Sequence, residues 1–393
     1  MYILTLLFGL FYQTLALNKL SVDALVAHFS EVLSPGSQVW LPSSANYTSA
    51  ITQRWTIYPP AEPTYILALK PALPSDIQTI IRFASNHNIP FMATGGGHGY
   101  STTLHSCKNG IDIDLETGLA ECVGVVGATL GAGLGPYTGL HGLVIDALLE
   151  VRYVTGTGEL ITSSKTENLE LFWGARGAGH QFGIVYEATY RIHDATNNGE
   201  LVVASMRFHS KDNTSSHLFS AAAAVLAVIA AQRVSNWAVN LYTISIPAFT
   251  RTLQQLADFY SAFPSSRTSV WSIEKIRQFS NSFNTRRLKT AYPWRNTTIY
   301  TFVALQINED SQDDAINAFG ASFQAEMAAS SGYGDLRVYM NYGRDEGEKV
   351  WYSEGKLPRL KALKRTYDPM GYLVTYNPVK ISEQHEKSVI MDA

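Results

Sequence analysis

Three glycine-rich apolar stretches in the first half of the chain limit most strongly what it can fold into. They read "ATGGGHGYS" from Ala93, "GVVGATLGAGLGPYTGLHG" from Gly124 and "GARGAGHQFG" from Gly174. Glycine permits positive φ and lets the backbone come close to a bound group. Backbone N–H groups exposed in such loops form concavities that bind anions. Together the three stretches predict a chain that wraps an extended, pyrophosphate-bearing ligand with backbone atoms.

Length and composition set the class of protein. The chain has 393 residues, of which 46% are hydrophobic, so it can bury a large core and is expected to form two domains. Only 16% of residues are charged, the formal net charge is −3, and no basic run stands out. A nucleic-acid partner is therefore not expected. No stretch is long and apolar enough to predict a membrane span.

The N-terminus resembles a secretory signal. An apolar run from Ile3 to Tyr12 is followed by small residues that end at Ala16. This pattern predicts a signal peptide over residues 1–16 and a secreted protein, although the run lacks a preceding positive charge. The alternative is a buried N-terminal helix. Sequons at Asn46, Asn213 and Asn296 support secretion and glycosylation.

The chain has two cysteines, Cys107 and Cys122. Two cysteines form neither a disulfide framework nor a metal site by spacing, so no metal is expected. One disulfide between them and two buried thiols both remain open.

Alternating apolar patterns divide the chain into two regions. Residues 52–115 read as strand, helix, strand, loop and strand, with Ser75 as the helix N-cap. "LEVRYVTGTGELITSS" predicts a hairpin, and the stretch 168–193 predicts a short helix, a glycine loop and a strand. After about residue 195 glycine thins out. The strand-like segments "WAVNLYTISI", "TIYTFVALQI" and "LRVYMNY" there alternate with helical ones, which predicts a sheet covered on one face by helices.

A dinucleotide-binding Rossmann fingerprint is rejected. Gly131, Gly133 and Gly135 form G-x-G-x-G, and Pro136 stands where a helix should continue. No G-K-[ST] follows a glycine loop either, so a Walker loop is excluded.

Four stretches in order carry a resemblance to a known family. They are "PSDIQTIIRFASNHNIPFMATGGGHGYS", "CVGVVGATLGAGLGPYTGLHGLVIDALLEVRYVTGTGELI", "ENLELFWGARGAGHQFGIV" and "RLKALKRTYDP". The chain resembles the FAD-linked oxidases of the vanillyl-alcohol oxidase and berberine-bridge-enzyme type, above all the fungal secreted members that act in secondary metabolism. The resemblance implies an α+β fold. A two-part PCMH-type FAD-binding domain (38–195 and 356–393) would enclose an inserted antiparallel-sheet substrate domain at 196–355 covered by helices.

The resemblance also implies the cofactor residues. Thr94 to Gly99 would hold the FAD pyrophosphate through backbone N–H groups, and His98 would bond covalently to the flavin 8α-methyl carbon. The full set of residues matched to the family's FAD site is Thr94, Gly95, Gly96, Gly97, His98, Gly99, Gly124, Gly127, Ala128, Thr129, Gly131, Gly133, His141, Gly142, Asp146, Gly183, Ile184, Val185, Tyr376 and Asn377.

Two departures from the family pattern matter. Some members attach FAD a second time through a cysteine, but Ala120 aligns with that position and Cys122 lies two residues later. We therefore predict a single link through His98, with Cys122 as an outside candidate. The family also carries several dozen residues after the strand ending at Leu115, where this chain has only Glu116 and Thr117. The FAD domain is accordingly expected to be shortened.

The expected reaction is oxidation of an alcohol, a sugar or a secondary-metabolite intermediate by hydride transfer to the flavin, with dioxygen as acceptor. The base is expected in "VYMNY", at Tyr339 or Tyr342, because the family has a Tyr-x-Asn pattern there. A tyrosine base needs a lowered pKa or an acidic helper; the alternative is that both only cover the core. We expect a monomer that acts on a small molecule. Two alternatives are a nicotinamide-dependent dehydrogenase and a flavin-less or impaired relative.

Overall fold

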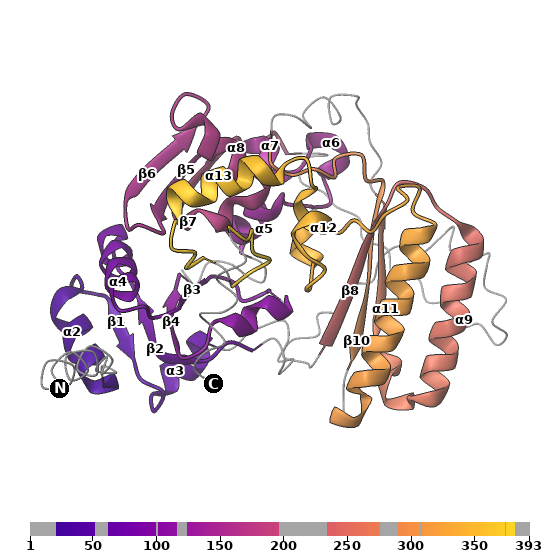
Figure 1. Cartoon of the computed structure of the whole chain (residues 1–393), viewed down its shortest axis with the longest axis horizontal. Helices are drawn as coiled ribbons and strands as arrows, with labels where there is room; N and C mark the ends of the chain where they lie inside the picture. The colour runs from indigo at the N-terminus through magenta and orange to yellow at the C-terminus, as the bar shows by residue number, and fades with distance from the viewer. Residues whose placement is uncertain are drawn as a thin grey trace, which may run out of the picture.

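The computed structural model describes residues 21–51, 62–99, 101–115, 124–195, 234–275, 290–306, 309–373 and 375–381. The predicted signal peptide, Asn213, Cys122 and the junction that follows Leu115 lie outside the described residues. Within these ranges the strands form three sheets with helices packed against them (Figure 1).

The first sheet has mixed direction and carries the first glycine loop. Its strand order is β1 (Gln38–Trp40), β2 (Tyr65–Lys70), β4 (Gly110–Asp114) and β3 (Phe91–Thr94). Strands β2 and β3 run parallel to β4, and β1 is antiparallel to β2. The predicted order of strand, helix, strand, loop and strand is present from residue 65 onward. Strand β4 is buried on both faces, which places it at the centre of this region.

Helices α2 (Val22–Val32) and α4 (Pro74–Asn86) contribute to the apolar core on one face of this sheet, and α3 (Ala45–Ile51) contributes Tyr47 to the other. The prediction that Ser75 caps α4 is wrong. The helix begins at Pro74 after Leu73, and the Asp76 carboxylate accepts the Leu73 backbone N–H at 2.8 Å. A carboxylate in the first turn thus satisfies an amide that has no partner within the helix.

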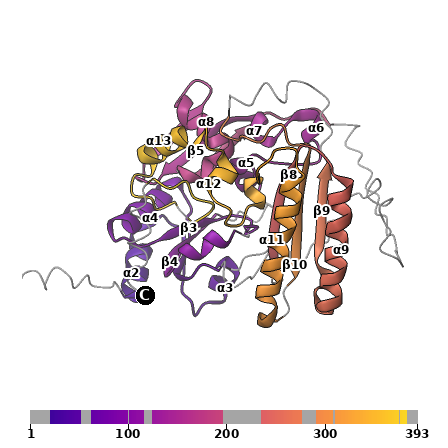
Figure 2. The same ribbon diagram turned by 45° about the vertical axis from the view of Figure 1, so that its right-hand side comes forward.

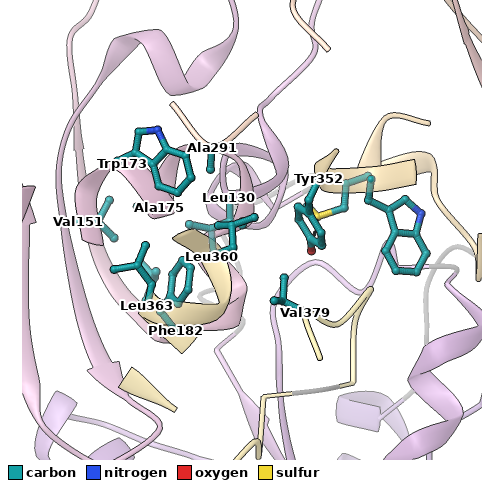
Figure 3. Packing of buried hydrophobic residues seen from close by; sticks show 14 of the residues in the cluster. Leu130, Val151, Trp173, Ala175, Phe182, Ala291, Tyr352, Leu360, Leu363 and Val379 are labelled. Carbon is teal, nitrogen blue, oxygen red and sulfur yellow. Dashed lines mark hydrogen bonds between the residues drawn. The ribbon is translucent and has the colours of Figure 1, made fainter. Parts of the chain in front are cut away.

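The second sheet is antiparallel and has the order β6 (Leu160–Ser164), β5 (Leu148–Thr155) and β7 (Gly183–Tyr190). The predicted hairpin is the pair β5–β6. Helices α8 (Leu169–Ala178) and α13 (Leu357–Tyr367) pack beside it, although α13 lies almost 200 residues after α8 in the chain (Figure 1). Their shared core contains Phe182, Leu360 and Leu363 (Figure 3). The C-terminal segment therefore returns to the N-terminal region.

Short helices connect the first two sheets. They are α5 (Val125–Gly131), α6 (Thr138–His141) and α7 (Val144–Ala147), and they contain the second glycine-rich stretch. Gly133 between them has φ +75°, and a Cβ at this position would collide with the Val144 side chain. The glycine here is needed for the close turn itself.

The third sheet is antiparallel and has the order β8 (Val234–Leu241), β10 (Ile299–Gln306) and β9 (Val270–Lys275). Helices α9 (Ile246–Ala262) and α11 (Asp313–Ala329) cover one face of it (Figures 1 and 2). The predicted sheet with helices on one face is present. Helix α9 was not predicted, and the strand expected to run through Ile246 ends at Leu241.

The segment "LRVYMNY" is not a strand, so that prediction is wrong. It runs beside β8, where the Asn240 N–H donates to the Arg337 carbonyl at 2.7 Å, and then turns into a 3-10 helix, Met340–Tyr342. The Asn240 side chain accepts the Tyr339 N–H at 3.0 Å in place of a neighbouring strand. After the turn come α12 (Glu348–Tyr352) and α13. None of the helices that the structure describes is long and apolar enough to cross a bilayer.

Candidate functional site

The first glycine loop leaves the end of β3 and is fixed where it begins. Thr94 donates its hydroxyl to Asp112 Oδ1 at 2.5 Å, and its carbonyl accepts the Leu115 N–H at 2.8 Å. Gly97 within the loop has φ +65°, a conformation that favours glycine. The loop is accessible at the surface: Gly95 is exposed, and Gly96, Gly97, His98 and Gly99 are half-buried.

The second glycine-rich stretch lies directly against this loop. A Cβ placed on Gly124 would stand 3.3 Å from the Gly96 backbone nitrogen. Gly95 and Gly127 differ, because a Cβ on either would meet nothing within 4 Å. Gly127 lies inside α5, where alanine would be the more stable residue. Open space above glycines of two adjoining segments is what a ligand bound to backbone atoms requires.

Two side chains from distant parts of the chain bridge these segments. The Tyr376 ring lies 3.2 Å from the Cβ position of Gly99, and its hydroxyl donates to the Asn341 carbonyl at 3.4 Å. Asn341 in turn donates its side-chain amide to the Ala128 carbonyl in α5 at 2.9 Å. The C-terminal tail and the segment after α11 thus meet at the two glycine-rich segments, residues 94–99 and 124–131. We call these two segments the cradle.

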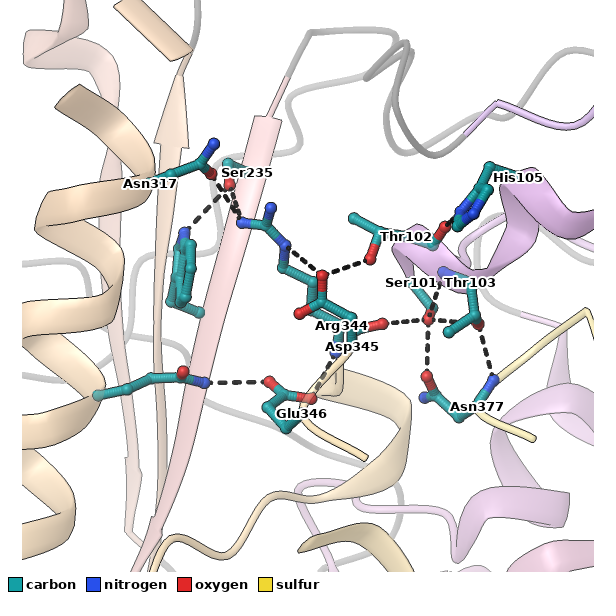
Figure 4. A network of polar contacts seen from close by, with 12 residues as sticks. Ser101, Thr102, Thr103, His105, Ser235, Asn317, Arg344, Asp345, Glu346 and Asn377 are labelled. Atoms are coloured by element: carbon teal, nitrogen blue, oxygen red, sulfur yellow. Dashed lines mark hydrogen bonds and ion pairs between the residues drawn. The ribbon is translucent and has the colours of Figure 1, made fainter. Parts of the chain in front are cut away.

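Asn377 ties the tail to the end of the loop (Figure 4). Its Oδ1 accepts the Ser101 hydroxyl at 2.6 Å, and its backbone N–H donates to Thr103 Oγ1 at 2.9 Å. Ser101 also hydrogen-bonds the Arg344 carbonyl, and Asn377 donates its amide to the Met340 carbonyl at 2.8 Å. The side chain of Asn377 is buried and holds three segments together.

Tyr339 is buried, and the partly buried Tyr342 packs edge to face against it with the ring centroids 4.9 Å apart. The Tyr339 oxygen accepts the backbone N–H groups of Gly133 and Leu134, each at 3.2 Å, and the Asn341 side-chain amide at 2.8 Å. Burial raises the pKa of Tyr339 to about 12, while these three donors lower it in part. The two backbone contacts anchor Tyr339 to the second glycine stretch.

Tyr342 has an acidic partner that sequence reasoning missed. Its hydroxyl donates to Oε1 and Oε2 of Glu274 at 2.9 and 3.0 Å. Burial raises the pKa of Glu274 above its usual range, and burial together with the Glu274 charge raises that of Tyr342. Glu274 lies on β9, 68 residues before Tyr342 (Figure 2). Neither Glu274 nor the strand β9 that carries it was predicted from the sequence.

His180 is a second residue that the sequence did not single out. Its ring meets the Tyr376 ring edge to face at 5.6 Å, and its Nε2 lies 3.3 Å from the Tyr352 hydroxyl. Burial, with the nearby Lys364 charge, lowers the pKa of His180 to about 3, so the imidazole is neutral. His180 therefore packs against the Tyr376 ring without adding a charge.

The remaining predicted residues do not all gather at the cradle. Asp146 forms a bidentate ion pair with Arg295, both contacts being 2.8 Å, and both side chains are buried. His141 and Gly142 line a separate cavity of about 420 Å³ whose lining includes none of residues 94–99. The His141 ring stacks on His193 at 4.1 Å there. A contact of His141, Gly142 or Asp146 with the cofactor stays a prediction.

Strand β7 begins with the last three predicted site residues, Gly183, Ile184 and Val185. Gly183 pairs with Thr155, and a Cβ on it would lie 2.5 Å from the Val154 carbonyl oxygen. Ile184 is buried in the core of the first sheet. Thr129 accepts the Tyr190 hydroxyl at 3.0 Å, which joins α5 to the same strand.

Known proteins match the chain along most of its length, although no family model matches. The FAD-linked oxidoreductase azaL of Aspergillus niger is 32% identical over 460 residues, which cover 88% of this chain and 97% of that protein. The FAD-linked oxidoreductase tazL of Aspergillus terreus is 31% identical over 462 residues, with 90% and 93% covered.

The chain belongs to the family of fungal FAD-linked oxidoreductases that includes azaL and tazL. It is an FAD-linked oxidoreductase that acts on a small molecule, and the alternative of a nicotinamide-dependent dehydrogenase is wrong. The alignment with azaL covers 460 positions, more than the 393 residues of this chain, so this relative has residues that the present chain lacks.

Solved structures of this kind share the fold. Physcomitrella patens BBE-like 1 superposes with a TM-score of 0.71 at 15% identity, covering 92% of this chain and 99% of that one. The glucooligosaccharide oxidase of Acremonium strictum gives 0.69 at 16% identity, with 93% and 100% covered. The predicted α+β fold of the FAD-linked oxidases is confirmed.

The cradle fits the cofactor of the family. FAD carries a pyrophosphate that backbone N–H groups bind well, and it needs room beside the backbone. Gly95 and Gly127 provide that room, while Tyr376 and Asn341 lie at its edge.

Proposed function

We propose that this FAD-linked oxidoreductase oxidises an alcohol, a sugar or a secondary-metabolite intermediate, with Tyr342 and Glu274 as the proton-accepting pair and dioxygen as the final acceptor. The observation that carries the proposal is the hydroxyl of Tyr342 hydrogen-bonded to both carboxylate oxygens of Glu274. We further propose that the protein is secreted and acts in fungal secondary metabolism. The fungal origin of its Aspergillus relatives supports the setting, and a carbohydrate oxidase from Microdochium nivale with the same fold supports a sugar among the substrates.

The proton path follows from the two pKa shifts. Tyr342 has a pKa well above its usual range, so it does not ionise alone near neutral pH. It can accept the substrate hydroxyl proton only if it passes its own proton to Glu274. Glu274 is suited to this because burial raises its pKa and makes it a stronger base than an exposed carboxylate. The chemistry that FAD supplies when bound is hydride acceptance and reoxidation by dioxygen.

The loop Thr94–Gly99 holds the cofactor pyrophosphate in this proposal, and His98 forms a single covalent link to the flavin. The resemblance of "ATGGGHGYS" to the family loop supports the link. The Acremonium strictum oxidase is described with a 6-S-cysteinyl, 8α-N1-histidyl FAD. A single link is proposed here because Ala120 stands where the second attachment is expected.

Acid precipitation tests the cofactor half of the proposal. The purified protein should give a yellow, fluorescent pellet, and His98→Ala should release its flavin into the supernatant while His105→Ala, seven residues later, should not. Flavin that stays in the His98→Ala pellet would rule out His98 as the sole link.

A flavin-less or impaired relative is the second candidate. The observation that favours it is the alignment of 460 positions against a chain of 393 residues. A colourless protein that neither retains nor binds added FAD would establish it and end the first proposal.

A further inference from the structure

Two aspartates on one face of β4 stand below the cofactor loop with different surroundings. Asp114 forms an ion pair with Lys70 at 3.6 Å. Asp112, two residues earlier, is fully buried, and no ion pair joins it to a cation in the described part of the chain. Lys70 therefore balances the charge of Asp114, whereas no cation among the described residues balances a charge on Asp112.

The hydrogen bonds of Asp112 are also incomplete. Its Oδ1 accepts the Thr94 hydroxyl at 2.5 Å, and Oδ2 has no hydrogen-bond partner among the described residues. The buried Tyr65 hydroxyl on β2 likewise has none there. An ionised carboxylate in such a place lacks the donors that normally offset the loss of water.

Among the residues that the structure describes, no neighbouring group supplies a compensating positive charge to Asp112. The titratable side chains that face Asp112 are Tyr65 on β2, Tyr47 on α3, and Cys107 before β4, all of which are neutral near pH 7; Asp114 adds a like charge. Lys70 pairs with Asp114. Burial first, and then the Asp114 charge, raise the pKa of Asp112 to about 7.

The position of Asp112 links this carboxyl to the cofactor loop. Thr94, its hydrogen-bond partner, directly precedes Gly95 and the loop proposed to hold the pyrophosphate. A negative pyrophosphate and an ionised Asp112 would repel each other across a poorly screened interior. A protonated Asp112 keeps the bond from Thr94 and removes the repulsion.

We propose that Asp112 is a positioning residue that holds the loop Thr94–Gly99 as a neutral carboxylic acid, and that FAD binding above neutral pH therefore takes up one proton at Asp112. The proposal rests on the proposed role of this loop in holding the FAD pyrophosphate.

The expected pH dependence has a definite sign. Where Asp112 is already protonated in the free protein, FAD binding involves no proton and its Kd is constant. Above that range binding must add a proton, so Kd rises by up to tenfold per pH unit until the carboxyl ionises in the complex too.

Flavin-free full-length protein provides the test. It is produced in a riboflavin-limited host in a His98→Ala background, so that FAD stays exchangeable. FAD is titrated from pH 6 to pH 9, with binding followed by flavin fluorescence. Asp112→Asn keeps the shape and cannot ionise; Asp114→Asn removes the neighbouring carboxylate that Lys70 already compensates.

The parent and Asp114→Asn should both lose FAD affinity as pH rises from 7 to 9, by up to about tenfold per pH unit, whereas Asp112→Asn should show a flat Kd. An Asp112→Asn slope equal to the parent slope would overturn the inference. If Asp112→Asn does not fold, proton uptake by the parent on FAD addition at pH 8, measured with an indicator dye, decides it, and no uptake would overturn it. Full-length protein with His98 in place that takes up no FAD at any pH would instead refute the proposed function.

Discussion

The cofactor cradle and the tyrosine–glutamate pair are built in opposite ways. The cradle consists of backbone from two segments, Thr94–Gly99 and Gly124–Gly131, with side chains omitted where a ligand needs room. The pair consists of two side chains, on β9 and on the turn Met340–Tyr342, held together by two hydrogen bonds. A backbone site depends on local sequence, whereas a side-chain site depends on the whole third sheet being in register.

The same contrast separates what each region tolerates. We expect Glu274 on the third sheet to be exchangeable without disturbing the cradle, because its carboxylate hydrogen-bonds Tyr342. The cradle is less uniform: a Cβ on Gly124 would press on the Gly96 backbone and one on Gly131 on the Asn341 side chain, whereas Gly95 and Gly127 have open space beside them. Variants that act on one region and spare the other put this division to the test.

The largest expected effect is on the reaction itself. Glu274→Gln removes the proton acceptor of Tyr342, so kcat should fall roughly 10²- to 10⁴-fold, the usual contribution of a positioned base. Flavin content and the flavin spectrum should stay unchanged. In the parent enzyme, activity should fall with acidification through a Glu274 pKa that lies above its usual range.

Tyr342→Phe should reproduce the loss in kcat with little further loss in the double variant, because the two residues act as one unit. Independent, multiplying losses measured by steady-state kinetics would mean that the pair does not share the proton.

The next effect concerns the buried ion pair between Asp146 and Arg295. Arg295→Met should lower the free energy of unfolding by about 3–5 kcal/mol, since it leaves the buried Asp146 carboxylate uncompensated. Denaturant unfolding measures it. Adding Asp146→Leu should recover most of the loss; a double variant as unstable as Arg295→Met would show that the charge is not the cause.

The cradle was predictable from sequence and the pair was not, for a physical reason. Glycines in "ATGGGHGYS" mark their own requirement for close approach, so the loop followed from its motif. Tyr376 was expected at the FAD site, but its packing beside Gly99 was not predicted. Glu274 carries no such mark, because its role arises only when β9 brings it to Tyr342. The same limit explains "LRVYMNY", whose alternation predicts a strand. Its N–H at Tyr339 instead finds the Asn240 side chain.

Helix α9 shows a related limit. The β-branched residues that end "LYTISI" favour a continued strand. The Ser245 hydroxyl instead accepts the Ala248 N–H at 3.4 Å and caps a helix whose apolar side then packs on the third sheet. The helix cap at Ser245 and the packing of α9 on the sheet outweigh the local strand propensity here. In the first region, where strands and helices alternate with clear turns, propensity and packing agree.

Two glycines give a matched pair of smaller effects. Gly183→Ala should destabilise the protein by about 1–3 kcal/mol, because the new Cβ would press on the Val154 carbonyl oxygen. Gly127→Ala should instead stabilise flavin-free protein by about 0.5–1 kcal/mol, since it removes a glycine from α5 without a collision.

The same Gly127→Ala protein should bind FAD more weakly, and fluorescence titration measures this. A variant that gains stability and keeps its FAD affinity would mean that the space above Gly127 does not belong to the cofactor.

The smallest effect is expected at Tyr376, where ring and hydroxyl have different partners. Tyr376→Phe removes only the 3.4 Å hydrogen bond to the Asn341 carbonyl, so the free energy of unfolding should fall by less than about 1 kcal/mol with FAD retention unchanged. Tyr376→Ala also removes the ring beside Gly99 and should lower FAD retention. Retained flavin and thermal midpoints of both variants measure the two effects. If the phenylalanine variant loses flavin as readily as the alanine variant, the hydroxyl's tie to Asn341 carries the contact between the regions. The cradle would then depend on the third sheet after all.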